Sequence, residues 1–146
     1  MIEVVGNLWT YSPCDVRVIT TNGTVRKNGE AVMGRGCALE AKRMFPSIAE
    51  YLGDCIRRSG NHVHFLVGGN TEVWSFPVKH QWMEKADPAL IYRSAEELRA
   101  AVDERSAVRV VVMPRPGCGN GQLLWTDVRK VLSPILDDRF HVIHFG

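Results

Sequence analysis

The sequence lacks paired cysteines, long apolar runs and a strong excess of charge of either sign. Its four cysteines, Cys14, Cys37, Cys55 and Cys118, stand far apart and show none of the CxxC spacing that zinc sites use. We therefore expect reduced thiols and no metal centre. The 18 basic and 16 acidic residues leave a net charge of +2, which is too small by itself to indicate a nucleic-acid partner.

No stretch is long and apolar enough to span a bilayer, and the first residues show no basic segment followed by an apolar run. We therefore expect a cytoplasmic location and no contact with a membrane. With 45% hydrophobic and 23% charged residues, the composition is typical of a globular chain. A chain of 146 residues can bury most of its apolar surface in one core, so we predict one domain over residues 1–146 and expect a monomer.

Apolar segments of two different periods alternate along the chain. Short β-branched or alternating segments predict strands at residues 2–5, 15–20, 62–67, 72–76, 107–112 and 140–145, the fifth of them buried on both faces. Helical spacing predicts helices that follow Cys37, Pro46, Asp87 and Leu124, the second ending at Gly60 and the last interrupted by Pro134. Residues 24–32 are interpreted as an irregular loop, and residues 77–82 as another. The alternation predicts a three-layer α/β/α fold around a central mixed sheet.

Two glycine-rich loops precede predicted helices, GRG at residues 34–36 and GCGNG at residues 117–121. Backbone N–H groups ahead of a helix suit an anion, most often a phosphate, and two such loops suit a diphosphate. Neither loop has the GxxxxGK[ST] pattern, and GRGCAL lacks the third glycine of GxGxxG, so we expect neither a P-loop nor a Rossmann site. Ligands of such sheets bind beyond the carboxyl ends of the strands, where loops at Asn22, Lys79 and Gly117 are expected to converge.

Three motifs in order resemble one family. AVMGRGCALEAKRMFP, FPVKHQW and PRPGCGNGQLLW together are similar to the macrodomains, in the branch of the antitoxin that removes ADP-ribose from DNA and of the terminal ADP-ribose glycohydrolase. The likeness extends over nearly the whole chain. It implies that ADP-ribose lies across the strand ends, with its diphosphate between the two glycine loops. It further implies that the distal ribose faces Asn22 and Lys79, and that Asn7 and Leu8 lie toward the adenosine.

The resemblance implies no cofactor and a set of residues that bind ADP-ribose. They are Asn7, Leu8, Thr21, Asn22, Met33, Gly34, Arg35, Gly36, Cys37, Ala38, Pro114, Gly117, Cys118, Gly119, Asn120, Gly121 and Leu123.

The chain departs from the family pattern at three places. Asn7 stands where many macrodomains have an aspartate that contacts adenine. The insertion TVRKNG leaves Asn22 and Asn28 as alternatives for the residue that faces the ribose, and we favour Asn22 because it directly follows a strand. Gly121 stands where the terminal glycohydrolase has its catalytic aspartate, whereas the DNA antitoxin resembles this chain in having glycine. Any chemistry must then come from elsewhere in the site, and the resemblance to the DNA antitoxin points to Lys79.

Lys79 can be interpreted either as a reactive amine of the site or as a solvated lysine in a loop. In water a lysine has a pKa of about 10.4 and is protonated at neutral pH, so it needs burial or a neighbouring cation to become reactive. An amine so activated could attack the anomeric carbon, or it could hold and activate the open sugar. The alternative is a solvated loop lysine, the commoner fate of lysines.

Several neighbouring residues have two interpretations each. His80 either lowers the pKa of Lys79 and touches substrate or is merely exposed. Cys37 and Cys118 fit as small residues beside a bound phosphate, with thiol catalysis as the lesser alternative because no partner base is evident. Trp74, Trp82 and Trp125 are expected to pack in the core, although Trp82 could stack on a base, and Arg26 and Lys27 are either solvated or in contact with a nucleic-acid phosphate.

The sequence thus favours an enzyme, an ADP-ribosyl glycohydrolase that uses Lys79 to release ADP-ribose from modified DNA or protein. A module that binds ADP-ribose without turnover is the first alternative. A phosphatase or hydrolase of a free ADP-ribose derivative is the second. Fold resemblance by itself does not decide among these three.

Overall fold

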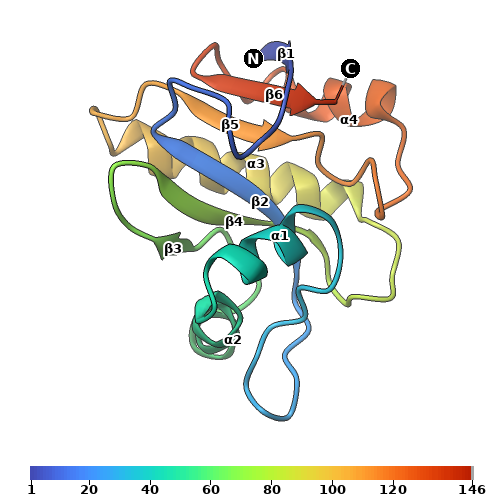
Figure 1. Ribbon diagram of the computed structural model, residues 1–146. Coiled ribbons are helices and arrows are strands. Elements are labelled where there is room, and N and C mark those ends of the chain that lie inside the picture. Colours follow the sequence, from blue (N-terminus) through green and yellow to red (C-terminus); the bar gives the residue numbers. More distant parts are fainter. Residues whose placement is uncertain (146) are drawn as a thin grey trace.

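The computed structural model describes residues 1–145, which form a six-stranded sheet with helices on both sides (Figure 1). The sheet order is β1-β6-β5-β2-β4-β3, and all neighbours are parallel except the antiparallel pair β3 and β4. In chain order the elements are β1 (Ile2–Val5), β2 (Val16–Asn22), α1 (Gly36–Met44), α2 (Ile48–Ser59), β3 (Phe65–Val67), β4 (Glu72–Lys79), α3 (Pro88–Asp103), β5 (Val111–Pro114), α4 (Trp125–Leu132) and β6 (Phe140–His144).

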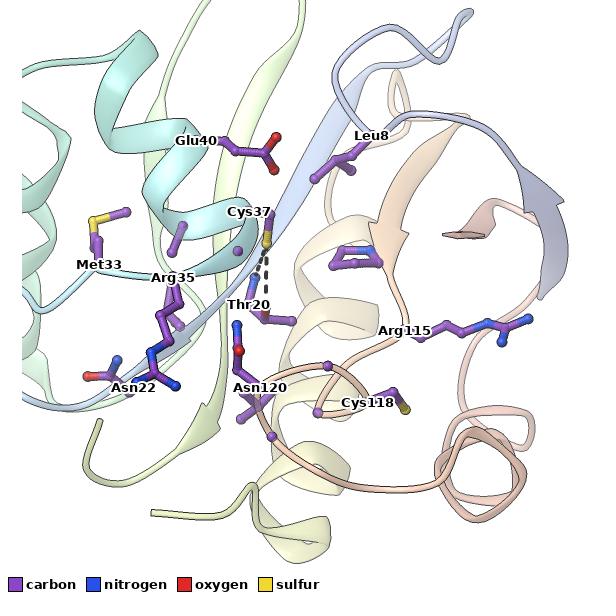
Figure 2. A pocket seen from close by; sticks show the side chains of 18 of the residues that line it. Leu8, Thr20, Asn22, Met33, Arg35, Cys37, Glu40, Arg115, Cys118 and Asn120 are labelled. Atoms are coloured by element: carbon purple, nitrogen blue, oxygen red, sulfur yellow. Dashed lines mark hydrogen bonds between the residues drawn. The ribbon is translucent and has the colours of Figure 1, made fainter. Parts of the chain in front are cut away.

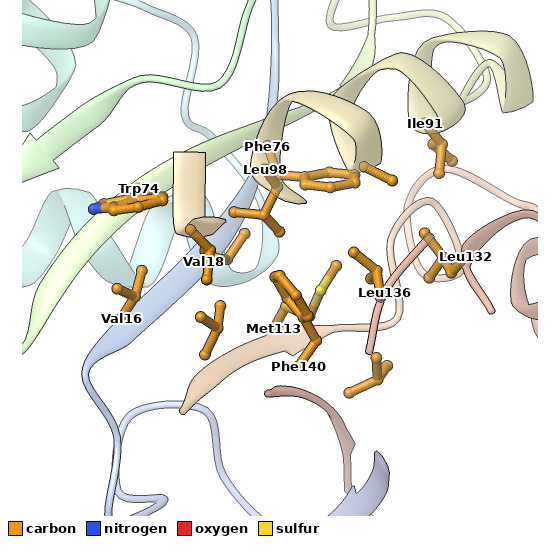
Figure 3. Packing of buried hydrophobic residues seen from close by; sticks show 14 of the residues in the cluster. Val16, Val18, Trp74, Phe76, Ile91, Leu98, Met113, Leu132, Leu136 and Phe140 are labelled. Carbon is orange, nitrogen blue, oxygen red and sulfur yellow. The ribbon is translucent and has the colours of Figure 1, made fainter. Parts of the chain in front are cut away.

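Two apolar cores, one on each face of the sheet, lie between the sheet and the two layers of helices. On one face α3 and α4 pack against the strands, with Phe76, Leu98, Met113 and Phe140 fully buried between them (Figure 3). On the other face α1 and α2 cover a second core that includes Leu52. Successive side chains of a strand point to opposite faces, so central strands between two helical layers must be apolar on both. The predicted three-layer α/β/α fold with a mixed sheet is therefore confirmed.

Several helix boundaries follow the predicted capping signals. The Asp87 carboxylate accepts a hydrogen bond from the N–H of Ala89 (2.9 Å), with Pro88 at the first position of α3. Gly60 follows α2 with φ of 92°, a left-handed conformation that residues other than glycine rarely adopt. The last helix, α4, ends at Leu132, two residues before Pro134.

Three predicted strand boundaries are wrong, two of them because side chains of other segments accept the backbone N–H groups. Residues 107–110 are not a strand, because the Asp15 carboxylate takes the N–H groups of Arg109 and Val110, and Arg109 is exposed rather than buried. Residues 62–64 are likewise outside β3, because the N–H groups of Val63 and His64 go to side chains of other elements.

β4, by contrast, runs through Pro77 to Lys79 instead of ending at Phe76. Among the described residues β3 pairs only with Val73 and Trp74, so no strand pairs with Pro77 on that side of β4, and a proline is tolerated at such an edge. The loop between β2 and α1 is also less irregular than expected, since Val25 and Ala31 form an antiparallel bridge.

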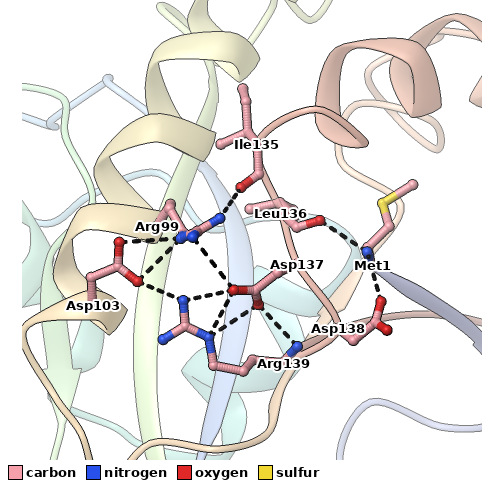
Figure 4. A network of polar contacts seen from close by, with 8 residues as sticks. All are labelled: Met1, Arg99, Asp103, Ile135, Leu136, Asp137, Asp138 and Arg139. Atoms are coloured by element: carbon pink, nitrogen blue, oxygen red, sulfur yellow. Dashed lines mark hydrogen bonds and ion pairs between the residues drawn. The ribbon is translucent and has the colours of Figure 1, made fainter.

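A polar network lies at the amino end of β6, away from the strand ends that the sequence implicates (Figure 4). Arg139 donates to the carboxylates of Asp137 and Asp103, and Arg99 donates to Asp103 and to the carbonyl of Ile135. These hydrogen bonds hold the pKa values of Asp103 and Asp137 below the ordinary carboxyl range. The network joins the end of α3 to the segment before β6.

Within residues 1–145 no helix has the length and apolar character that a bilayer crossing requires.

Candidate functional site

A cavity of about 860 Å³ lies across the carboxyl ends of the parallel strands. Its walls come from the ends of β2, β4, β5 and β6, from the segment after β1 and from the start of α1. The volume lies within the range of roughly 300–1,000 Å³ that small-molecule and cofactor sites occupy. Parallel strands bring their carboxyl ends to one edge, so residues far apart in sequence meet in this cavity.

Lys79 and every predicted ligand residue except Leu123 line the cavity. Leu123 is not among the lining residues, and its side chain packs against the core under α3 instead. It lies next to Gly117, where an added Cβ would come within 3.1 Å of Leu123 Cδ1. Leu123 thus packs against Gly117 on the core side of the glycine loop.

The first glycine loop leads into the uncapped start of α1. Arg35 is the N-cap residue, with extended φ and ψ of −147° and 156°, and it makes no side-chain capping bond. In the first turn of a helix the N–H groups have no partner inside the helix. Those of Gly36, Cys37 and Ala38 therefore meet the cavity with the positive end of the helix dipole behind them.

The second glycine loop faces the first across the cavity. A Cβ on Gly36 would lie 3.5 Å from Asn120 Nδ2, so the two loops nearly touch at this point (Figure 2). A Cβ on Gly34 or Gly119 would meet nothing within 4 Å, which leaves both backbones accessible to a ligand.

Gly121, in contrast, is packed too closely to carry any side chain. A Cβ there would lie 2.5 Å from the carbonyl oxygen of Gly117 and 2.7 Å from Ala86 Cβ. An aspartate at this position would require the loop backbone to move.

A β-bulge at the end of β4 sets Lys79 beside Asn22. In the β2–β4 register Thr21 pairs with Pro77, but the next pair is Asn22 with Lys79, which leaves Val78 as the extra residue. Val78 is buried at the cavity floor, and the side chain of Lys79 is less buried at the same cavity. Bulges commonly change the pairing at the end of a strand, and this one pairs Asn22 with Lys79 where the unshifted register would pair it with Val78.

Burial lowers the pKa of Lys79, and the charge of Arg35 lowers it further. The ammonium group donates to the carbonyl of Trp82 at 3.3 Å. His80 contributes neither cause, because its Nε2 pairs with the Asp87 carboxylate at 2.8 Å. The suggestion that His80 tunes Lys79 is therefore wrong, and the neighbouring cation is Arg35.

Asn22, rather than Asn28, lines the cavity. Its Nδ2 donates to the carbonyl of Val32 and its Oδ1 accepts from the N–H of Thr24, both at 3.0 Å. One amide hydrogen and one oxygen lone pair remain for a ligand. The exposed side chain of Asn28 donates to Glu30 within its own turn.

Burial raises the pKa of both loop thiols, Cys37 and Cys118. Cys37 Sγ lies 3.4 Å from the N and from the Oγ1 of Thr20, a contact that joins the start of α1 to β2 (Figure 2). These environments oppose thiolate formation and favour the interpretation of both cysteines as small packing residues.

Sequence reasoning missed the cavity residues that follow the last strand. Ile143, His144 and Phe145 line the end near Asn7, because β6 is parallel to β5 and ends at the same edge. The strand-end rule, applied to every apolar strand, could have found them. Thr20, Thr24, Glu40 and Arg115 also line the cavity without a sequence motif to mark them.

The tryptophans divide between the core and the cavity. Trp74 is buried, and Trp125 packs against the core with the Arg115 guanidinium 4.9 Å from its ring centroid. Trp82 is 46% exposed at the cavity edge, so the expectation that it packs in the core is wrong.

The site is thus a glycine-lined cavity at the strand ends of a helix-flanked sheet, the place where open α/β proteins bind their ligands. No protein-family model matches the chain. Its fold is that of the solved macrodomain of Mycobacterium tuberculosis DarG, with a TM-score of 0.80 and 25% identity over 98% of both chains. A structure of Thermosipho africanus DarTG in complex with ADP-ribose has a TM-score of 0.75 and 18% identity, over 97% of this chain and 41% of that one.

A DNA ADP-ribosyl glycohydrolase of Thermus aquaticus is 30% identical over an alignment of 139 residues, and the match covers 90% of this chain and 36% of that protein. The chain thus spans about a third of the length of the curated relatives it matches. Fold, cavity and these similarities agree, and the chain belongs to the macrodomain family.

Proposed function

We propose that this chain is an ADP-ribosyl glycohydrolase that releases ADP-ribose from a modified macromolecule, in the first place DNA, with Lys79 as its catalytic residue. The observation that carries the proposal is one cavity that two glycine loops line together with a lysine whose pKa is lowered. The curated relatives are named DNA ADP-ribosyl glycohydrolase, and these names support the same activity.

The diphosphate is proposed to lie between the start of α1 and the loop at residues 117–121. Free N–H groups at the first turn of α1 approach it from one side, and the exposed backbone of Gly119 approaches it from the other. Asn120, which lies 3.5 Å from the position of a Gly36 Cβ, would close over the phosphates.

The adenosine is proposed to lie toward Asn7 and Leu8. Arg17 holds this segment by donating to the carbonyl oxygens of Leu8 and Tyr11, at 2.5 and 3.0 Å. The Asn7 Oδ1 atom accepts from the N–H of Trp9 at 2.8 Å. Its Nδ2 hydrogens remain to donate to an acceptor nitrogen of the base, where an aspartate could only accept.

At the other end Lys79 and Asn22 are proposed to meet the distal ribose. A lowered pKa leaves more of the Lys79 amine neutral at a given pH, and a neutral amine has the lone pair needed to attack the anomeric carbon. The new carbon–nitrogen bond forms as the bond to the acceptor breaks, and the acceptor leaves with the electron pair. Water then releases ADP-ribose and regenerates the amine.

The test is release of ADP-ribose from ADP-ribosylated single-stranded DNA and peptides by the parent protein and by Lys79→Ala. We expect a loss of at least about a hundredfold in rate with ADP-ribose affinity retained, since one catalytic group typically supplies that much or more. Lys85→Ala, which removes an exposed lysine outside the cavity lining, is the matched control and should keep the parent's rate.

The outcomes separate the alternatives. Equal rates for the parent and Lys79→Ala would contradict the assigned role of Lys79. Calorimetric binding of ADP-ribose without release from any acceptor would make the chain a binding module. Turnover of small ADP-ribose derivatives only would make it a hydrolase of the free compound.

A further inference from the structure

An exposed tryptophan stands at the edge of the cavity, next to Lys79. Trp82 is 46% exposed and lines the cavity, whereas Trp74 is 3% exposed in the core. Its backbone is held on both sides, since its N–H donates to Thr24 Oγ1 at 3.0 Å and its carbonyl accepts from Lys79 Nζ at 3.3 Å. The indole is thus an open aromatic surface on a fixed backbone, beside the atoms proposed to react.

Arg26 reaches the same edge from the loop that projects beyond α1 and α2 in Figure 1. The loop is ordered by the Val25–Ala31 bridge, and the carbonyl of Arg26 accepts from Gly29 N at 2.9 Å and from Arg57 at 3.3 Å. The two carboxylates nearest in sequence are engaged locally, Glu30 with Asn28 and Glu84 with the N–H of Gln81.

Unpaired positive charge gathers at this end of the cavity. Within residues 1–145, Arg26, Arg35 and Lys79 form no ion pair, whereas arginines elsewhere, such as Arg99 and Arg139, are paired with carboxylates (Figure 4). The one carboxylate among the described lining residues is that of Glu40, which Figure 2 shows toward Leu8. The acceptor end therefore attracts an anion as well as an aromatic ring.

We propose that Trp82 and Arg26 form a subsite for the acceptor strand of a single-stranded nucleic acid. The base that carries ADP-ribose stacks on Trp82, and a phosphate of the same strand binds Arg26. Stacking on an aromatic side chain and phosphate pairing with arginine are the two contacts that single-stranded nucleic acids make most generally. A modified peptide offers neither a base nor a backbone phosphate. This subsite rests on the proposed function, because it names the acceptor of that reaction.

The experiment compares three ADP-ribosylated substrates. A single-stranded oligonucleotide and the matching nucleoside without phosphates carry ADP-ribose on the same base, and a peptide is the control. We expect Trp82→Ala to lower kcat/KM roughly ten- to hundredfold on the oligonucleotide and the nucleoside, as loss of one stacked base does, and to spare the peptide. Trp82→Phe should retain most of the activity, which a merely structural loss would not predict.

Arg26→Ala should act on the oligonucleotide alone. It should reduce the slope of log(kcat/KM) against log(salt) by about 0.7, the value for one phosphate contact on a single strand, and leave the nucleoside unaffected. The matched controls are Tyr92→Ala and Lys130→Ala, which remove an aromatic and a cation from the groove between α3 and α4. Both should behave like the parent on all three substrates.

Equal losses from Trp82→Ala on the peptide and on the nucleoside would overturn the subsite, as would an unchanged salt slope for Arg26→Ala. If the parent releases ADP-ribose from none of the substrates, the proposed function fails by itself. In that case fluorescence anisotropy of the ADP-ribosylated oligonucleotide still tests the subsite, since Trp82→Ala must weaken its binding relative to Tyr92→Ala.

Discussion

Replacing Gly121 with alanine tests the packing that excludes a catalytic side chain from the second glycine loop. The added Cβ would lie 2.5 Å from Gly117 O and 2.7 Å from Ala86 Cβ. Neither neighbour can move easily, because Gly117 O accepts from Leu123 N at 2.9 Å and Ala86 N donates to Gly121 O at 3.1 Å. Gly121 has no positive φ, so its backbone conformation is open to alanine and the penalty is steric.

Overpacking by one methyl group typically costs about 1–3 kcal/mol, and we expect about 3 kcal/mol here because the clash is with backbone. With a urea m-value of about 2 kcal/mol/M, the midpoint of unfolding should fall by about 1.5 M. Urea denaturation followed by tryptophan fluorescence measures this shift. Gly121→Asp, which introduces the carboxylate that the terminal glycohydrolase has at this place, should destabilise the fold further.

Gly119→Ala is the matched control in the same loop. Its Cβ would meet nothing within 4 Å, so the free energy of unfolding should change by less than about 0.5 kcal/mol. Its methyl group would enter the cavity, so ADP-ribose affinity should fall. A Gly121→Ala protein with the parent's urea midpoint would refute the packing argument and reopen this position to a side chain.

Two further predictions follow from the charges. Arg35→Gln removes a cation that lowers the pKa of Lys79, so the pH at which kcat rises should move upward, as a pH–rate profile at saturating substrate would show; an unmoved profile would contradict the coupling. Arg139→Gln removes the donor that lowers the pKa values of Asp137 and Asp103. A carboxyl group whose pKa is lowered in the folded state stabilises the fold at pH values above its unfolded-state pKa of about 3.9. This stabilisation is lost as the pH falls through the folded-state pKa. The variant should therefore have a lower Tm at pH 7 and a flatter decline of Tm below about pH 4, and parallel curves would argue against this role.

The sequence by itself determined the fold class and most of the cavity wall. Apolar periodicity marked the central strands, since a strand between two helical layers must be apolar on both faces. Capping signals such as Asp87 marked helix ends because they act through neighbours two or three residues away. The two glycine loops were visible because backbone exposed to a ligand requires small residues.

Long-range contacts decided what the sequence could not. Residues 107–110 read as a strand, but a carboxylate of Asp15, distant in sequence, takes their N–H groups. Leu123 falls inside the glycine motif, yet its side chain packs toward the core. The cation that lowers the pKa of Lys79 is Arg35 from the start of α1, not the adjacent His80.

Gly121 and Lys79 show the division most clearly. Sequence indicates a residue without a side chain in one loop and a lysine after a strand. Only the tertiary structure shows that a side chain on Gly121 would clash with Gly117 and Ala86, and that a bulge pairs Lys79 with Asn22. Local periodicity sets which elements form, whereas packing between elements sets which side chains have room and which charges become neighbours.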